Sequence, residues 1–573
     1  MRKPSASGIA YWAVVLFSWQ ATAQQATPVP VVGVQTGIDP RTGQRPARQN
    51  INDLYLLGGP QWDLYILALA ALQDANEEDE LSYFGISGIH GTPHRAWNGV
   101  EQVPGGLDGG YCPHQDILFP TWHRAYVLLF EQTLVSHAVR IAKLYPSNRS
   151  PTYQAAAQVL RQPFWDWASQ PMLPVAVTLA HVTVTGPEGP VTIHNPLYNY
   201  RFQRKSDVKK LGFEQNITLR CPVTETDNTN NATASDQKMV QIASSLKTQV
   251  WDVFVRSKTF EQMTFDSKEG PSFENPHGSV HNEVGCGMTM GNIDRSAFDP
   301  LFMLHHCNVD RLVALWQAIN PRSPMFTTTH PSTGQFGTAR GTNITADSPL
   351  KPFFSEEGGF LTSNMMADIR KFGYTYPEID DWSTTPENLE SFVRSRISTL
   401  YGESSSNLDT APTQRRGQRN RYPPPARTRQ YFVAEIQVNR SEIVRPSTIN
   451  LVLEGVIVGR MSILEMPRTG MASASVPLRD LVVGNKSVTD MAASEGITLL
   501  QQRLEMEIRL NDGSEISVDT VPSLELEIQG MTYVPSLSVD RFPQLGGATK
   551  RPVAVHRVVG PIRYLGSGRV AGV

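Results

Sequence analysis

The sequence shows no marked excess of either charge. Its 573 residues include 51 lysines and arginines against 54 aspartates and glutamates, which gives a formal net charge of −3. A protein that binds nucleic acid through the phosphates usually carries a clear basic excess. We therefore expect no nucleic acid among its partners.

Long hydrophobic runs are also missing. A membrane-spanning helix needs about 20 consecutive apolar residues, and the apolar run at residues 9–17 is much shorter. It follows Arg2 and Lys3 and precedes the small-residue pattern at residues 21–23, an order that is typical of a secretory signal peptide. We expect residues 1–23 to be a signal peptide, the protein to be secreted, and no membrane partner. An uncleaved N-terminal anchor is the alternative.

Cysteine is scarce, with four residues at positions 112, 221, 286 and 307. Exported proteins form disulfides readily. Cys112 and Cys307 lie inside histidine-rich segments, so Cys221 and Cys286 are the predicted disulfide pair. Six N-x-S/T sequons agree with export and predict a glycoprotein: Asn148, Asn216, Asn231, Asn343, Asn439 and Asn485.

Apolar residues recur at helical spacing in the first region of the chain, residues 24–400. The helical segments are residues 52–75, 121–145, 242–254 and 298–319. The polar stretch at residues 183–235 is rich in Gly, Pro, Asn and Thr, and we expect loops there.

The composition changes after residue 400. Residues 401–430 are rich in Ser, Pro and Arg and predict a linker, with a possible processing site at the Arg415-Arg416 pair. Residues 431–545 contain strand-length apolar and alternating runs, which predict a β-rich domain. Residues 546–573 form a basic tail without a clear element.

Eight of the 13 histidines fall into two short, well-separated clusters. They are His90, His94, His114 and His123 in the first cluster, and His277, His281, His305 and His306 in the second. Histidine outnumbers Asp and Glu at the plausible ligand positions. This favours a redox metal bound by imidazole over a carboxylate-rich iron, magnesium or calcium site.

The second cluster carries the stronger signal. His277 and His281 stand one helical turn apart, so their side chains share a face. The run from Phe298 to Arg311 is mostly apolar up to two adjacent histidines, and a buried apolar face accepts histidine only with a partner or a metal. Paired copper fits best, because two copper ions exchange one electron each with dioxygen, which zinc cannot do.

The order of these motifs resembles type-3 copper proteins, specifically fungal tyrosinases and catechol oxidases. The resemblance covers about residues 45–380 and rests on GIHG, GYCPH, ILFPTWHR, HxxxH and FDPxFxxHHCNVDR. The RPAR run at residues 45–48 and the tyrosines of GYTYPE, Tyr374 and Tyr376, resemble motifs that frame the family's catalytic domain. The implied fold is a mainly α catalytic domain, a four-helix bundle holding a dicopper site, followed by a β-sandwich-like C-terminal domain that can cover the active site.

The resemblance also implies a ligand set for two copper ions. The first ion, CuA, would be held by His90, His114 and His123, and the second, CuB, by His277, His281 and His306. His94 and His305 are then left out. Asp310, one helical turn after His306, is expected to orient a ligand imidazole, with a buried salt bridge to an arginine as the alternative.

Cys112 stands two residues before His114, as in fungal members that link this cysteine to the histidine ring by a thioether. The resemblance implies the same crosslink here, and a free buried cysteine is the alternative. No CxxC occurs in the C-terminal region, so cysteine-based copper loading there is not expected.

Three further residues bear on the reaction that the resemblance implies. Phe302 matches a bulky residue that shields CuB, with core packing as its other role. Glu274 matches a glutamate that orients a water near CuB, with a solvated surface carboxylate as the alternative. Gly278 departs from the family, because tyrosinases that hydroxylate monophenols often have Asn there to help deprotonate the phenol.

We therefore expect a secreted dicopper oxidase that converts o-diphenols (catechols) to o-quinones with O2. The alternative is a tyrosinase that also hydroxylates monophenols. A haemocyanin-like oxygen carrier and a zinc hydrolase are more remote. The family also associates such enzymes with pigment (melanin) formation. The sequence does not indicate the preferred phenol or the oligomeric state.

Overall fold

The computed structural model of the protein describes residues 28–554, apart from residues 108, 205–207, 225, 266–269, 403–428 and 479–480. The predicted signal peptide, the Arg415-Arg416 pair and most of the predicted tail lie outside the described residues. Within the described part of the chain, no helix is long and apolar enough to cross a membrane.

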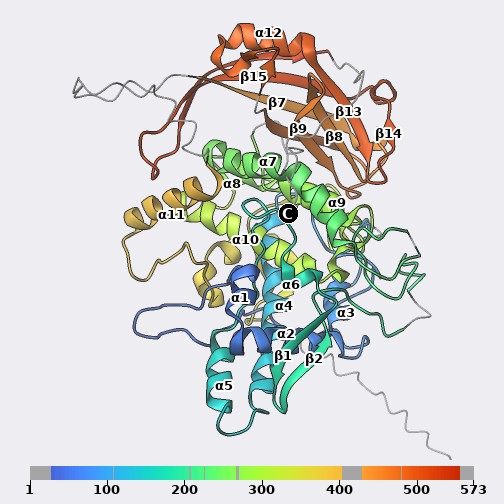
Figure 1. The fold of residues 1–573 in the computed structure, drawn as a ribbon, viewed down its shortest axis with the longest axis vertical. Coiled ribbons are helices and arrows are strands. Elements are labelled where there is room, and N and C mark those ends of the chain that lie inside the picture. Colours follow the sequence, from blue (N-terminus) through green and yellow to red (C-terminus); the bar gives the residue numbers. More distant parts are fainter. Residues whose placement is uncertain are drawn as a thin grey trace, which may run out of the picture.

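The first region is built mainly from helices (Figure 1). They are α1 (Ile51–Leu57), α2 (Gly59–Gln73), α3 (Tyr83–Ser87), α4 (Phe119–Ala142), α5 (Ser150–Val159), α6 (Val175–Thr178), α7 (Ala232–Arg256), α8 (Phe260–Thr264), α9 (Glu274–Gly285), α10 (Leu301–Ile319) and α11 (Pro386–Tyr401). Three two-stranded antiparallel sheets accompany them: β1 (His181–Gly186) with β2 (Gly189–His194), β3 (His330–Pro331) with β4 (Asn343–Ile344), and β5 (Pro349–Phe354) with β6 (Phe360–Thr362).

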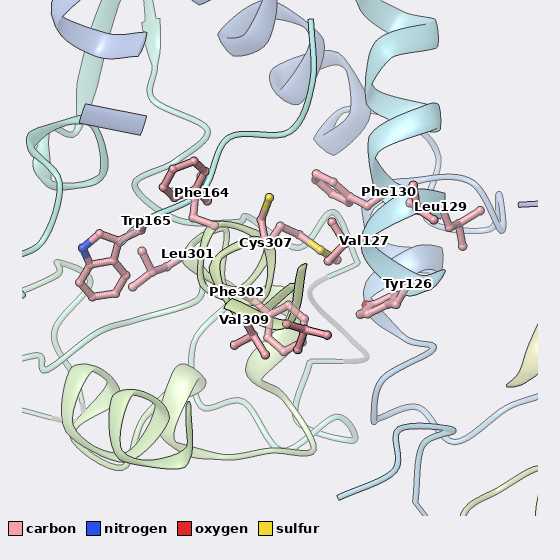
Figure 2. Packing of buried hydrophobic residues seen from close by; sticks show 14 of the residues in the cluster. Tyr126, Val127, Leu129, Phe130, Phe164, Trp165, Leu301, Phe302, Cys307 and Val309 are labelled. Carbon is pink, nitrogen blue, oxygen red and sulfur yellow. The ribbon is translucent and has the colours of Figure 1, made fainter. Parts of the chain in front are cut away.

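Helices α4, α7, α9 and α10 form the centre of this region, with α4 packed on α10 and α7 on α9. Helix α4 is buried on almost every side, and its Tyr126 and Phe130 belong to the same apolar core as Phe302 and Val309 of α10 (Figure 2). Burial of apolar surface is the main stabilising contribution to such a core. The expected helical bundle is confirmed.

One local expectation for this region is confirmed with a break, and another is wrong. Residues 52–75 are helical as expected but form two helices, because Gly58 and Gly59 take positive φ angles of 59° and 73° and Pro60 lies in the first turn of the second helix. Within residues 183–235, the hairpin β1–β2 forms instead of loops only. Val182 and Val184 alternate with exposed residues and bury one face of that hairpin.

The C-terminal region consists of two four-stranded antiparallel sheets, with strand orders β10-β7-β15-β16 and β14-β13-β8-β9. The elements are β7 (Arg429–Asn439), β8 (Ser447–Leu453), β9 (Val456–Ile463), β10 (Met471–Leu478), β11 (Val482–Val483), β12 (Lys486–Ser487), α12 (Ala493–Arg503), β13 (Leu504–Leu510), β14 (Glu515–Ile516), β15 (Glu525–Val534) and β16 (Gln544–Val553).

The two sheets share an apolar core. Alternate residues of facing strands, such as Phe432 and Ile436 on β7 and Ile449 and Leu451 on β8, are fully buried in it. This β-sandwich confirms the fold class. Its last strand reaches Val553, past the boundary expected at residue 545, because β16 pairs with β15 although its own residues are mostly polar.

Candidate metal centre

Seven of the eight clustered histidines meet in the centre of the helical region. Each is at most 2% exposed. They are His90, His114, His123, His277, His281, His305 and His306. His94 is the exception: it is half-buried, and its Nε2 lies 2.7 Å from the Asp294 carboxylate.

The first half of the site comes from a loop and from helix α4. Nδ1 of His123 lies 2.8 Å from the carbonyl oxygen of Phe119, and Nδ1 of His90 lies 3.1 Å from that of Ile293. A ring that donates from Nδ1 keeps a lone pair on Nε2, and this arrangement is usual for metal-binding histidines. His114 completes the half, with its ring 5.4 Å from that of His90.

The second half comes from helices α9 and α10. Nδ1 of His281 lies 2.8 Å from the carbonyl oxygen of Met290, and its Nε2 lies 3.3 Å from Nε2 of His306. His277 stands one turn earlier, 4.7 Å from His281 between ring centroids. The halves meet where His306 stacks on His123 at 4.4 Å.

The site has the properties of a metal centre. Burial lowers the pKa of His281 to about 4 and that of His123 to about 3, so both rings are neutral and able to bind a metal. Among the described residues, Nε2 of His114 and both ring nitrogens of His277 have no hydrogen-bond partner. Buried polar atoms without partners are rare, and a ligated metal would satisfy them.

Three groups of side chains in the described residues could each hold a metal ion. They are His277, His281, His305 and His306; His90, His123 and His306; and His90, Cys112 and His114. Neutral imidazoles in two adjoining sets fit a pair of copper ions.

The residues expected to affect the reaction lie beside these histidines. Phe302 is fully buried and stacks on His306 at 4.1 Å, so its ring serves both the site and the core. Glu274 is also buried, rather than a solvated surface carboxylate, and accepts a hydrogen bond of 2.6 Å from the backbone N–H of Gln115. It thereby joins the start of α9 to the segment that carries His114.

Aromatic residues that the sequence analysis did not single out also line the site. The Phe119 ring lies 4.9 Å from both His123 and His277, and the Trp122 ring lies 4.9 Å from His123. Both occur in the ILFPTWHR run, but its helical spacing does not distinguish them from ordinary core residues. Their rings keep water away from the histidines.

Within the part of the chain that the structure describes, the hydrogen-bond partners of Asp310 are arginines and tyrosines rather than a histidine. Its carboxylate pairs with Arg124 and lies 3.0 Å from Arg48, and it accepts hydrogen bonds of 2.7 Å from Tyr374 and Tyr376. Burial opposes its ionisation, but the two arginines hold the pKa of Asp310 below its ordinary value. Asp310 therefore has the ion-pair role, and it joins the RPAR run to the tyrosine motif, since Arg48 also stacks on Tyr374 at 3.7 Å.

The cysteines occupy two different settings. Cys221 and Cys286 form a disulfide, which is the pair predicted from the sequence and which fastens the end of α9. Sγ of Cys112 lies 3.5 Å from Nδ1 of His114, close enough for the proposed crosslink to form with a small movement. Cys307 is fully buried beside Tyr376.

The β-sandwich lies directly on helix α9 (Figure 1). Asn275 accepts a hydrogen bond of 3.0 Å from the backbone N–H of Ser462, and Ser279 and Ser462 share a hydrogen bond of 2.8 Å. Arg460 forms an ion pair of 2.8 Å with Glu283. These contacts come from strand β9, which therefore holds the helix that carries His277 and His281.

The segment after β9 also lies beside the first half of the site. Met466 and Pro467 line a cavity of about 20 Å³ together with His90, Cys112 and His114. A cavity of about 150 Å³ is known to hold benzene. The cavity that Met466 and Pro467 leave beside His90 and His114 is therefore too small for a phenol.

Comparison with known proteins supports this description. Residues 80–319 match the common central domain of tyrosinase. A tyrosinase of Podospora anserina is 34% identical over 65% of this chain and 69% of its own length, and polyphenol oxidase 2 of Agaricus bisporus is 33% identical over 64% and 67%. A structure of latent and active mushroom tyrosinase matches 93% of this chain and all of its own, with 25% identity and a TM-score of 0.77. The holo-protyrosinase of Aspergillus oryzae shares the fold, with a TM-score of 0.68 at 21% identity.

The helical bundle, the two histidine half-sites and the appended sandwich define a dicopper oxidase. The chain belongs to the tyrosinase and polyphenol oxidase family. The resemblance drawn from its motifs is thereby confirmed.

Proposed function

We propose that the protein is a tyrosinase that hydroxylates monophenols and oxidises the resulting o-diphenols to o-quinones with O2. The observation that carries this proposal is the 34% identity with a tyrosinase over 65% of the chain, combined with seven buried histidines in one site. This proposal replaces the expectation of an enzyme restricted to o-diphenols.

That expectation depended on Gly278, and the structure offers another reason for a glycine there. A Cβ atom at this position would stand 3.4 Å from the side chains of Leu464 and Ser462. A larger residue such as Asn would press against both, so glycine allows the sandwich to pack closely on α9. Glycine at this position therefore does not by itself argue against a phenol-hydroxylating reaction.

The side chains of the centre would have distinct roles toward two copper ions. We propose His90, His114 and His123 as ligands of CuA and His277, His281 and His306 as ligands of CuB. When bound, the copper pair supplies the electron transfer between phenol and O2. The carbonyl contacts of His90, His123 and His281 fix their rings, and Phe119 and Phe302 exclude water.

We also propose that the intact chain is a latent form. The cavity of about 20 Å³ beside Met466 supports this, since a phenol needs much more space. Cleavage in residues 401–430, with Arg415-Arg416 as the expected site, would break the covalent connection between the helical region and the β-sandwich. The sandwich could then dissociate.

Export remains a proposal that the sequon asparagines support. All six are at least partly exposed in the structure, as glycosylation requires. We propose that the protein is secreted after removal of residues 1–23.

Oxygen uptake tests the proposed reaction. The intact chain and a trypsin-trimmed chain, both loaded with copper, are compared on a monophenol and on the matching catechol. We expect the intact chain to be slow and the trimmed chain to consume O2 with both substrates. Oxidation of the catechol alone would indicate an enzyme restricted to o-diphenols. Reversible O2 binding without turnover would indicate an oxygen carrier. One zinc per chain would point to a hydrolase.

The variant Gly278→Asn in the trimmed chain separates the two explanations for this glycine. If Gly278 serves packing alone, the ratio of monophenol to catechol turnover stays close to that of the trimmed wild type. A large rise in that ratio would assign Gly278 a part in substrate preference.

A further inference from the structure

Strand β9 of the sandwich is bound by helices α7 and α9 through its main chain. The backbone carbonyl oxygen of Arg460 accepts hydrogen bonds of 3.3 Å from the side-chain amides of Gln249 and Asn275. The backbone N–H of Ser462 donates a hydrogen bond of 3.0 Å to Asn275. Nearly every residue of a polypeptide carries this carbonyl and this N–H. These contacts therefore recognise an extended chain as such, whatever its side chains are.

The two amides are aligned by the helical region itself. Nε2 of Gln249 on α7 also donates to the hydroxyl of Ser245, one turn earlier, at 2.9 Å. Oε1 of Gln249 accepts a hydrogen bond of 3.0 Å from Nδ2 of Asn275 on α9. Both amide side chains are at most 4% exposed. Because none of these bonds involves the sandwich, the pair stays aligned when the sandwich leaves, and it then offers a preorganised donor and acceptor.

The bound segment continues past the metal centre. Leu464 lies against Gly278, 3.4 Å from the place that a Cβ atom would take there, and Gly278 directly follows His277. Two residues later, Met466 lines the small cavity beside the first half of the site. Residues 460–466 therefore run from the amide pair, along the second half of the site, to the first half. The sandwich keeps a stretch of polypeptide over the histidines while the chain is intact.

The surface that holds this stretch is available to another chain once the sandwich has left. A peptide in the same position would satisfy the amide pair through its own carbonyl and N–H, as strands do when they add to a partner. A small phenol has no main chain and leaves both amides to water. A site built to form hydrogen bonds discriminates against a molecule that lacks the matching groups, so the amide pair affects which phenols are preferred.

We propose that Gln249 and Asn275 are specificity residues that bind the main chain of a peptide substrate, so that a tyrosine within an extended peptide is preferred over a free phenol. The proposal rests on the proposed function, including the departure of the sandwich. The substrate's tyrosine takes the place of Leu464. The residue four positions before it offers its carbonyl oxygen to both amides, and the residue two positions before it donates its N–H to Asn275.

Two peptides of the same composition test this arrangement. Both are blocked at their ends; one has four residues before its tyrosine, and the other has the same four residues after it. The copper-loaded full chain is nicked by trypsin, as in the test of the proposed function, and O2 uptake is measured with each peptide and with 4-methylphenol. We expect the KM of the peptide that ends in tyrosine to be about tenfold lower than that of the other peptide, with a similar kcat.

The variant Gln249→Leu tests one amide directly, since leucine is of similar size but forms no hydrogen bond. The measured quantity is the ratio of kcat/KM for the peptide that ends in tyrosine to kcat/KM for 4-methylphenol. We expect this ratio to fall about three- to tenfold. General damage to the fold lowers both values and cancels in the ratio. Gln237→Leu makes the same change at an exposed position on α7 and should leave the ratio unchanged.

The outcomes separate this proposal from the proposed function. Equal KM values for the two peptides in wild type, or a wild-type ratio in Gln249→Leu, would overturn the recognition of the main chain, whereas turnover of 4-methylphenol would still support the proposed function. If the nicked wild type oxidises neither the peptides nor 4-methylphenol, both proposals fail.

Discussion

The side-chain hydroxyls of Ser279 on helix α9 and Ser462 on strand β9 lie 2.8 Å apart and share a hydrogen bond. Ser279 stands two residues from both His277 and His281, so it points away from the face that carries these histidines. The helix is therefore fixed from two sides, by the imidazole cluster on one and by the β-sandwich on the other. This placement suggests the first test.

Replacing Ser462 by Asp should activate the intact chain. A carboxylate at this buried position would take the place of the hydroxyl that now bonds Ser279, and burying a charge is costly. We expect the sandwich to detach more often and o-diphenol oxidation by the uncut, copper-loaded chain to rise severalfold. The rate of O2 uptake measures this.

The control for that variant is Ser494→Asp. Ser494 is exposed on α12, on the outer side of the sandwich, so the same change there should leave the rate unchanged. Equal rates for Ser462→Asp and wild type, with both chains intact, would contradict the role assigned to this contact.

The buried carboxylate of Asp310 should be important for stability. Asp310→Asn removes the anionic partner of the buried Arg124 and leaves Arg48 paired with Glu131 alone, and breaking a buried ion pair from one side costs about 3–5 kcal/mol. Urea unfolding should show a loss of this order. Asp368→Asn is the matched control, because its pair with Arg370 is exposed and should change stability by at most about 1 kcal/mol.

Glu435 should make stability depend on pH near neutrality. Burial raises the pKa of Glu435 to about 7, although Arg256 and the Ser475 hydroxyl oppose the shift. Asp252 and Lys550 also act on this carboxylate. In the folded protein Glu435 keeps its proton up to about pH 7, whereas in the unfolded chain it loses the proton near its ordinary value of 4.5. Folding is therefore favoured at low pH, and this contribution is lost as the pH rises from about 4.5 to 7.

The comparison of wild type with Glu435→Gln isolates that contribution. The free energy of unfolding is measured for both by urea titration between pH 4.5 and 8. We expect the wild-type value to fall relative to the variant up to about pH 7 and to run parallel above it. A constant difference across the whole range would show that the carboxyl titrates normally.

Mass spectrometry tests the proposed link between Cys112 and His114. Both residues lie in the tryptic peptide 96–124. A thioether between sulfur and ring carbon lowers the mass of this peptide by two hydrogen atoms and protects Cys112 from alkylation. We expect this in protein exposed to copper and O2, while Cys307 in the same unfolded sample alkylates fully. An alkylated, full-mass peptide would show a free thiol at Cys112.

The sequence allowed much of the site to be predicted because metal ligands are specific in type and spacing. His277 and His281 are one helical turn apart, and both lie in the cluster. The sequence could not separate His305 from His306, because adjacent residues on a buried helix differ only in the direction of the side chain. The role of Asp310 depended on Arg48, which is distant in the sequence and meets it only after folding.

The contacts of the sandwich with α9 could not be predicted from the sequence either, because they join residues that are distant along the chain. Ser462 lies near the end of β9 and Leu464 directly follows that strand, so neither stands out in the sequence, yet both lie against Gly278. Likewise, the hairpin β1–β2 has only a few apolar residues on its buried face. Its pairing is determined by the surface of α2 on which it packs.

The polar contacts between α9 and β9 imply that cutting the chain and uncovering the centre are two separate events. While the chain is intact, the sandwich is tethered beside α9, and its effective concentration there is high and fixed. After a cut between the two regions, the same contacts join two molecules, and their association follows mass action. The fraction of nicked protein that remains covered would then depend on how dilute it is, so the enzyme's activity would reflect its concentration as well as its proteolysis.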